Sequence, residues 1–318
     1  MGLHCQSCIL VSADSEQVSQ RPSVRGNEYS CTSCFYILAI KHRLNMKKTL
    51  VAILALQGVV HADTSWAFDG TLTSTGNKQI TAVAKGGTAT YVDSGLTVGS
   101  SIGDYTLTKD LGKAIDLTQA GLYLALPDVY YTAGAGKLAI GGTNDTSFTI
   151  MGYVKYSTLT GEQYFFGTGA NNTGGLGFGV ANGNLNLVAK NVGNNPLTAS
   201  NDTYTLSTDQ WYHLAVSYDN STNTATFYVN GDSVGSKAVT TVSTTPNGHG
   251  AAIGSSCQDL VNNAVRDDFN GYIADLSVYN SALNQKEIMK FAGLVPEPST
   301  ATLSLLALAG LAARRRRR

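Results

Sequence analysis

Cysteine, proline and tryptophan are scarce in this 318-residue sequence, with five, six and two residues respectively. Four of the five cysteines lie before residue 35, so the rest of the chain holds only Cys257 and excludes an internal disulfide there. We expect that lone cysteine to be buried or inert. Glutamate is also rare, because only Glu162 and Glu287 occur between residues 63 and 293.

Motifs for catalysis are missing as well. Glycosidases need a pair of carboxylates across the scissile bond, and the two glutamates of the body do not form one at strand spacing. The sequence has no H-E-x-x-H and no phosphate loop. His213 and His249 are isolated, and His213 is expected to be a satisfied structural histidine rather than a general base. We predict that the protein is not an enzyme, although aspartate-only catalysis stays open.

The formal net charge of zero hides a mildly acidic body. Residues 63–293 hold sixteen aspartates and two glutamates against eleven lysines and arginines. Nucleic-acid binding depends on Lys and Arg that neutralise phosphates, so it is not expected here. About 230 residues rich in Thr, Gly, Asn and Ser favour one β-sandwich or two small domains.

Residues 46–62 have the pattern of a secretory signal. Met46 is followed by two lysines, residues 49–60 are mostly apolar, and Val60-His61-Ala62 places small residues where signal peptidase reads them. We predict cleavage between Ala62 and Asp63. The alternative is a buried helix of a soluble protein.

Residues 1–45 do not fit ahead of such a signal. They contain C-x2-C-x22-C-x2-C at Cys5, Cys8, Cys31 and Cys34, a spacing typical of zinc sites. The stretch between the pairs has little hydrophobic periodicity. We interpret residues 1–45 as a leader from a start codon assigned too early, with a zinc ribbon as the alternative.

The C-terminus has three parts: the polar segment Val295, Pro296, Glu297 and Pro298, the apolar residues 300–313, and five arginines. An apolar helix of about 14 residues reaches about 21 Å, short of a hydrocarbon core of about 30 Å. The arginines would stay on the cytoplasmic side of a membrane. A tail anchor or a nucleic-acid-binding arginine tail is the alternative.

This tail resembles the PEP-CTERM sorting signal of Gram-negative bacteria. The resemblance implies export, transient anchoring in the inner membrane and processing by an exosortase, a membrane transpeptidase, with the product at the cell surface or in the extracellular matrix. It also implies an organism that makes exopolysaccharide or biofilm material.

Within the body, residues 147–156 alternate apolar and polar residues as a half-buried strand should, and strands are also predicted at residues 211–219 and 269–280. In the second of these, one face carries Trp211, His213, Ala215 and Ser217, and the other carries Tyr212, Leu214, Val216 and Tyr218. Asn-Gly pairs at 182–183 and 230–231 predict type I′ hairpins. Residues 87–108 are interpreted as two weak strands or a decorated loop.

One short helix is predicted near the end of the body. Asn284 and Glu287 have capping-box spacing, Leu283 and Ile288 could form a hydrophobic staple, and Gly293 is a natural stop.

From about residue 65 to 293 the chain resembles LamG-like, concanavalin A-like jelly-roll domains. The matching stretches are "WAFDG", "SFTIMGYVKYS", "DQWYHLAVSYDNSTNTATFYVNGDSVG" and "FNGYIADLSVYNSALNQKEI". The resemblance implies an all-β jelly-roll sandwich of two antiparallel sheets with one short C-terminal helix, over residues 63–294. The sorting signal, with a short hydrophobic tail helix, would follow at 295–318.

The resemblance also implies a calcium site near the domain ends, for which Asp69 and Asp275 are candidates. Ala274 stands where the closing motif usually has Asp, which weakens this expectation. The alternative is that both are solvated or turn-capping aspartates.

Three functions remain open from the sequence. The first is a surface module that binds polysaccharide or a matrix protein, with Tyr123, Tyr130, Tyr131, Tyr164 and Tyr204 able to stack on sugars. The second is a matrix protein without a defined ligand, and the third is a glycoside hydrolase of the concanavalin A-like class.

Overall fold

The computed structural model describes residues 62, 64–77, 79–126, 147–170, 174–190, 196–239, 251–255, 257–258, 265–266 and 268–297. These residues all belong to one compact unit that starts at Gly58. The predicted leader with its zinc-spaced cysteines, nearly all of the predicted signal, and the tail from Pro298 lie outside them. No helix among the described residues is long and apolar enough to cross a membrane.

Strands dominate the unit and form two main sheets, in which every pairing of named strands is antiparallel. The first sheet runs β15-β14-β13-β8-β19-β6-β3, with β1 paired to β19. Its strands are β1 (Thr64–Trp66), β3 (Thr90–Asp93), β6 (Lys113–Asp116), β8 (Phe148–Tyr156), β13 (Trp211–Asp219), β14 (Thr224–Val229), β15 (Asp232–Ala238) and β19 (Gly271–Tyr279).

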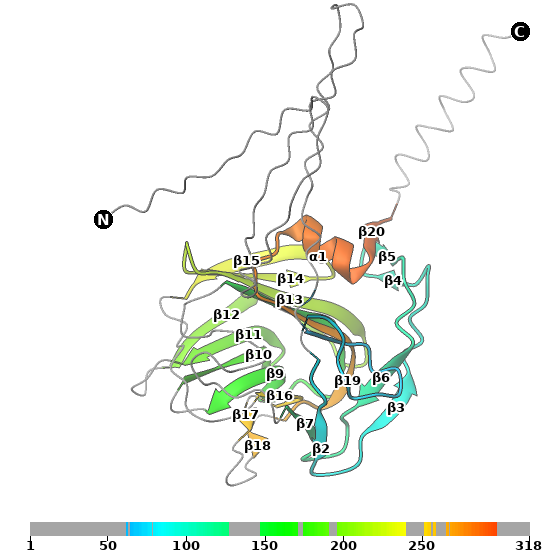
Figure 1. Ribbon diagram of the computed structural model, residues 1–318. Helices are drawn as coiled ribbons and strands as arrows, with labels where there is room; N and C mark the ends of the chain where they lie inside the picture. The colour runs from blue at the N-terminus through cyan, green and yellow to red at the C-terminus, as the bar shows by residue number, and fades with distance from the viewer. Residues whose placement is uncertain are drawn as a thin grey trace, which may run out of the picture. The chain divides into compact units, whose positions relative to one another are not determined.

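The second sheet has seven strands in the order β12-β11-β10-β9-β16-β7-β2 (Figure 1). Its strands are β2 (Val83–Lys85), β7 (Tyr123–Leu126), β9 (Glu162–Ala170), β10 (Gly174–Ala181), β11 (Asn184–Lys190), β12 (Pro196–Thr205) and β16 (Ala251–Ile253). The all-β jelly-roll class predicted from the sequence is confirmed.

Smaller elements complete the described part of the protein. A three-stranded sheet joins β4 (Ser101–Ile102), β5 (Tyr105–Leu107) and β20 (Leu294–Pro296), and a short hairpin joins β17 (Cys257–Gln258) to β18 (Val265–Arg266). The helix α1 (Gln285–Ala292) lies over the eight-stranded sheet (Figure 1). Residues 87–108 therefore contribute three strands, where the sequence suggested two at most.

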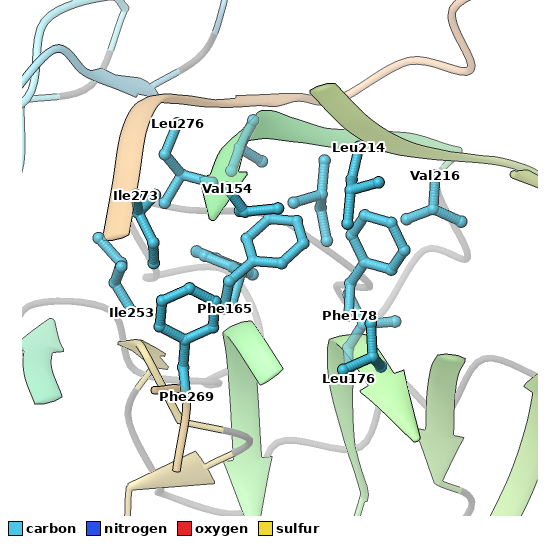
Figure 2. Packing of buried hydrophobic residues seen from close by; sticks show 14 of the residues in the cluster. Val154, Phe165, Leu176, Phe178, Leu214, Val216, Ile253, Phe269, Ile273 and Leu276 are labelled. Carbon is cyan, nitrogen blue, oxygen red and sulfur yellow. The ribbon is translucent and has the colours of Figure 1, made fainter. Parts of the chain in front are cut away.

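The main core lies between the two large sheets. Phe165, Leu176 and Phe178 of the seven-stranded sheet point toward Val154 and Leu214 of the other sheet (Figure 2). All five side chains are at most 2% exposed. Burying each such side chain contributes about 1.5–3 kcal/mol, so this interface supplies most of the driving force for folding.

The outer face of the eight-stranded sheet is buried too, which corrects one expectation. Residues 147–156 read as a half-buried strand, yet β8 is buried on both faces except at Lys155. Met151 and Ala215 pack against Ile288 of α1, and Tyr153 packs against Leu107 of β5. A third layer therefore covers this sheet, built from segments that alternation within β8 could not reveal.

The local motifs are confirmed. Asn182 and Gly183 join β10 to β11 with φ of 49° and 81°, as a type I′ turn requires. The second Asn-Gly pair joins β14 to β15 in the same way, with φ of 53° at Asn230 and 91° at Gly231.

The helix also begins and ends as predicted. The Asn284 side chain accepts from the Glu287 amide at 3.2 Å, and the Glu287 carboxylate accepts from the Asn284 amide at 2.9 Å. Gly293 closes the helix in the left-handed conformation, and Leu283 and Ile288 share one buried cluster.

We expect the Asn284→Ala variant to lose about 1 kcal/mol of unfolding free energy, because the Glu287 amide loses its acceptor. Chemical denaturation would measure the loss. The control is Lys286→Ala, an exposed position of the same turn, which should stay within about 0.5 kcal/mol of the parent. Equal stability of the two variants would contradict a role for the cap.

Candidate functional site

The outer face of the seven-stranded sheet carries a polar row across its middle strands. Leu185 and Leu187 of β11 face the core, so the intervening Asn186 points outward. In the register of the sheet, Asn186 stands opposite Gly179 of β10, which stands opposite Tyr164 of β9. The three positions therefore form one line across three strands.

Glycine in β10 is required by the tyrosine. The ring of Tyr164 leans over β10, since a Cβ on Gly177 would lie 3.0 Å from Tyr164 Cδ1. A Cβ on Gly179 would lie 2.0 Å from the Gln163 carbonyl oxygen, where β9 carries a bulge. These glycines let the tyrosine lie flat and close to the strand.

Hydrogen bonds connect the row. The Tyr164 hydroxyl donates to Glu162 Oε2 at 2.8 Å and accepts from Asn186 Nδ2 at 2.8 Å. Because the hydroxyl has one hydrogen, which goes to the carboxylate, Asn186 must turn its amino group toward the tyrosine. The orientation of the Asn186 amide is thus determined by its neighbour.

This orientation leaves Asn186 Oδ1 without a hydrogen-bond partner among the described residues, although Asn186 is only 1% exposed. A buried acceptor without a donor costs about 1–3 kcal/mol. Water or a bound ligand that brings a hydroxyl or amide hydrogen would remove that cost. Asn186 Oδ1 is therefore a buried acceptor to which a ligand could donate a hydrogen bond.

Access to the row is partial. The strand β17 lies against β9, β10 and β16, and Asp268 forms a bridge beside Tyr164. Glu162 at the start of β9 is exposed. The row is thus sheltered along its length and open at its carboxylate end.

Two of the five tyrosines proposed for sugar stacking, Tyr123 and Tyr164, do not present open ring faces. Tyr123 and Tyr164 are 2% and 1% exposed. Tyr204 is half-buried and packs against the main core. Tyr130 and Tyr131 lie outside the described residues. Polar contact through a buried tyrosine, rather than stacking on an open ring, is what this face offers.

His213 lies on the covered face of β13, with its ring centroid 4.9 Å from that of Tyr153. It is 1% exposed, and its Nδ1 has no hydrogen-bond partner within the described ranges. Burial, assisted by the nearby Lys109 charge, lowers the pKa of His213 from 6.5 to about 3. His213 is therefore buried, but the prediction of a satisfied histidine is wrong at Nδ1, and its structural role stays a prediction. His249 lies outside the described residues.

The two candidate calcium ligands have other partners. Asp69 Oδ1 accepts from the Lys113 amide at 3.1 Å, and Asp275 forms an ion pair with Lys109. Among the described residues, no group of three His, Cys, Asp or Glu could hold a metal. Calcium needs six to eight oxygens, so Asp69 and Asp275 fit poorly the calcium site that the resemblance implied.

The start of the predicted sorting motif is part of the fold. Val295 and Pro296 lie in β20, which pairs with β5, and the Glu297 carboxylate accepts from Ser101 Oγ at 2.9 Å. Pro298 lies outside the described residues. The Glu297 amide also donates to the Asp104 carbonyl at 3.1 Å. Both the side chain and the backbone of Glu297 are therefore hydrogen-bonded to the domain.

The predicted signal-cleavage point lies at the start of the fold. Ala62 packs against the cluster under α1, and β1 begins at Thr64. Asp63 lies outside the described residues. Cleavage after Ala62 would thus leave one residue ahead of the first strand, and the cleavage itself stays a prediction.

Sequence reasoning missed the pairing of Tyr164 with Asn186. The two are 22 residues apart, and only the register of three strands brings them into one row. The alternating glycines of "GGLGFG" were the available signal, because glycine in a strand marks the close approach of another group.

A family model for the concanavalin A-like lectin/glucanases superfamily matches residues 128–289, just over half of the sequence, and the protein belongs to this superfamily. A second family model, for the PEP-CTERM protein-sorting motif, matches residues 294–318. The motif marks an exported, envelope-associated protein. No curated protein matches the sequence.

Solved structures of similar shape were also found. Domain 4 of an extracellular arabinanase from Geobacillus stearothermophilus, in complex with arabinotriose, is 21% identical at a TM-score of 0.47, over 73% of this chain and 98% of that one. The CBM40 of an IT-sialidase from Ruminococcus gnavus, bound to α2,3-sialyllactose, is 16% identical at 0.46, over 57% and 96%. The binding domain of botulinum neurotoxin DC is 14% identical at 0.48, over 73% and 51%. No ligand is inferred from likenesses of this size.

We expect stability to depend on pH through His213. Its pKa is about 3 in the folded protein against 6.5 as its ordinary value, so the unfolded protein binds more protons between these values. Unfolding free energy should be constant above pH 6.5 and fall by about 1.4 kcal/mol per pH unit below it. Denaturation across pH 4–8 would measure the slope.

The slope should flatten in His213→Leu and persist in Ser217→Ala, which changes the same face of the same strand. An unchanged slope in His213→Leu would show that other groups cause the acid sensitivity.

We expect calcium to leave the thermal midpoint unchanged relative to EDTA, because Lys109 already neutralises Asp275 and a ligand stabilises only a folded state that binds it. Differential scanning fluorimetry would measure the midpoint. A calcium-dependent rise that Asp69→Asn abolishes would instead establish the calcium site.

Proposed function

We propose that this protein is a non-catalytic glycan-binding protein of the cell surface or extracellular matrix. Signal peptidase would release its N-terminus, and an exosortase would process its C-terminal tail. Its ligand is a polysaccharide or a glycan-bearing matrix component, bound at the Glu162–Tyr164–Asn186 row. An envelope of the Gram-negative type, with transient anchoring in the inner membrane, is the setting that this tail suggests.

The Asn186 Oδ1 that has no partner among the described residues is the observation that carries the proposal. A sugar presents hydroxyls that donate and accept at short spacing. In this row it would meet an acceptor at Asn186 Oδ1, a hydroxyl at Tyr164 and a carboxylate at Glu162, already held in place by one another. Such pre-ordered polar groups lower the entropic cost of binding. Membership of a lectin and glucanase superfamily supports the same ligand class.

The positions of the two glutamates support the proposal that the protein is not an enzyme. Glu162 begins a strand of the seven-stranded sheet and accepts the Tyr164 hydroxyl, whereas Glu287 caps α1 over the other sheet. The two cannot act as a pair on one glycosidic bond, since paired carboxyls lie about 5–9.5 Å apart across the sugar. The sheltered row suits retention of a ligand better than turnover.

The experiment is a glycan-array screen followed by calorimetry with the oligosaccharide bound best. We expect saturable binding, weakened about tenfold in Asn186→Ala, because one hydrogen bond of about 1.4 kcal/mol is lost. Asn184→Ala, two residues along the same strand and bonded to Thr205, should change Kd less than about twofold.

Three other results would count against the proposal. No saturable binding favours a matrix protein without a ligand. Equal loss in both variants places the site elsewhere. Release of reducing sugar from the bound glycan, abolished in Glu162→Gln, would favour a glycoside hydrolase.

A further inference from the structure

The folded domain continues into the sorting motif without a linker. The helix α1 ends at Ala292, and β20 begins two residues later at Leu294. β20 forms one edge of the small sheet β20-β5-β4, with Leu294 opposite Leu107, Val295 opposite Thr106 and Pro296 opposite Tyr105. The first residues of the motif therefore complete a sheet of the domain.

The spacing of the motif suits an edge strand. The Thr108 amide donates to the Gly293 carbonyl at 2.7 Å, and the Glu297 amide donates to the Asp104 carbonyl at 3.1 Å. Because bonded positions alternate in an antiparallel pair, residues 293, 295 and 297 turn their backbone groups toward β5. Pro296 falls on the open side, where its missing N–H costs no bond.

Side chains hold the start of the strand and the residues just before it. Leu294 is 3% exposed and joins Tyr153 and Leu107 in a buried cluster, whereas Val295 is 44% exposed. Ahead of the strand, Lys109 donates to the Phe291 carbonyl at 2.8 Å and Tyr153 donates to the Ala292 carbonyl at 2.8 Å. Together with the bonds of Glu297 to Ser101 and to the Asp104 carbonyl, these contacts hold the backbone against the domain from the end of α1 to Glu297.

A protease must bind its target in an extended, unpaired form, and β20 is already paired. We propose that residues 294–297 are the last strand of the folded domain, that the domain protects them from cleavage, and that processing therefore cuts beyond Glu297, on its C-terminal side. The protection stands by itself, and the position of the cut rests on the exosortase processing proposed above.

The chemistry of such a cut is an acyl transfer. The transpeptidase nucleophile attacks the carbonyl carbon of a peptide bond beyond Glu297 and forms an acyl-enzyme bond to it. The C–N bond breaks, and the tail leaves as an amine whose nitrogen receives the nucleophile's proton. Water or a primary amine then attacks the acyl carbon, which releases the protein and returns a proton to the nucleophile. The protein keeps Val295, Pro296 and Glu297 in either case.

Limited digestion of the full-length protein with proteinase K, read by intact mass, tests the protection. We expect a resistant fragment that ends at or beyond Glu297. Leu294→Asp should release the strand and speed cleavage within residues 294–297 at least about tenfold. Val295→Asp, one residue on and exposed, is the matched control and should digest as the parent does.

Leu294→Ala keeps the test decisive if Leu294→Asp fails to fold, because it removes part of the buried side chain and should give an intermediate rate. A parent fragment that ends before Glu297, or equal rates for the Leu294 and Val295 variants, would overturn the proposal.

Mass spectrometry of the protein recovered from the cell envelope then reads the natural C-terminus. An end at or beyond Glu297 supports the proposal, and an end at residues 293–296 overturns it. An uncut protein would overturn exosortase processing and the predicted cut, while the digestion still decides whether the strand is protected.

Discussion

Lys109 makes the interaction on which the covering layer depends. Its ammonium group joins Asp275, in the bulge of β19, to the Phe291 carbonyl at the end of α1. A cation at a helix C-terminus is favourable because the last carbonyls have no partner within the helix. The pair is partly exposed, with side chains 33% and 22% accessible, so the ion pair itself contributes little to stability. Its importance lies in the segments that it connects. It joins the eight-stranded sheet, the end of α1 and the loop between β5 and β6 at one point.

The two sheets consequently have different outer faces. The eight-stranded sheet is sealed by α1 and the small sheet, which buries His213 and raises the pKa of Tyr153 through desolvation. The seven-stranded sheet instead carries polar groups and glycines outward, and Asn186 Oδ1 there finds no partner in the described part of the protein. A sealed face suits stability and a polar, sheltered face suits binding. In the function proposed above, the domain divides the two requirements between its sheets.

Prediction from the sequence worked best where the signal is local. The turn pairs, the capping box and the inward faces of β8 and β13 each depend on residues a few positions apart. The outward face of β8 was misjudged, because its cover comes from residues 96–111 and 283–294, far along the sequence. The candidate row was missed for the same reason, since Tyr164 and Asn186 meet only through strand register.

The sequence alone determined the class of fold, the sorting motif at the C-terminus and the turns and helix caps, since these are written in short patterns that do not depend on distant partners. Tertiary structure decided which side chains lose water and which backbone groups find partners. It left a buried histidine nitrogen and one amide oxygen without hydrogen-bond partners among the described residues, and it made the first residues of a sorting motif into a strand. Whether a residue is buried or paired depends on the segment that packs against it. That segment is often distant in the sequence, so only the tertiary structure shows it.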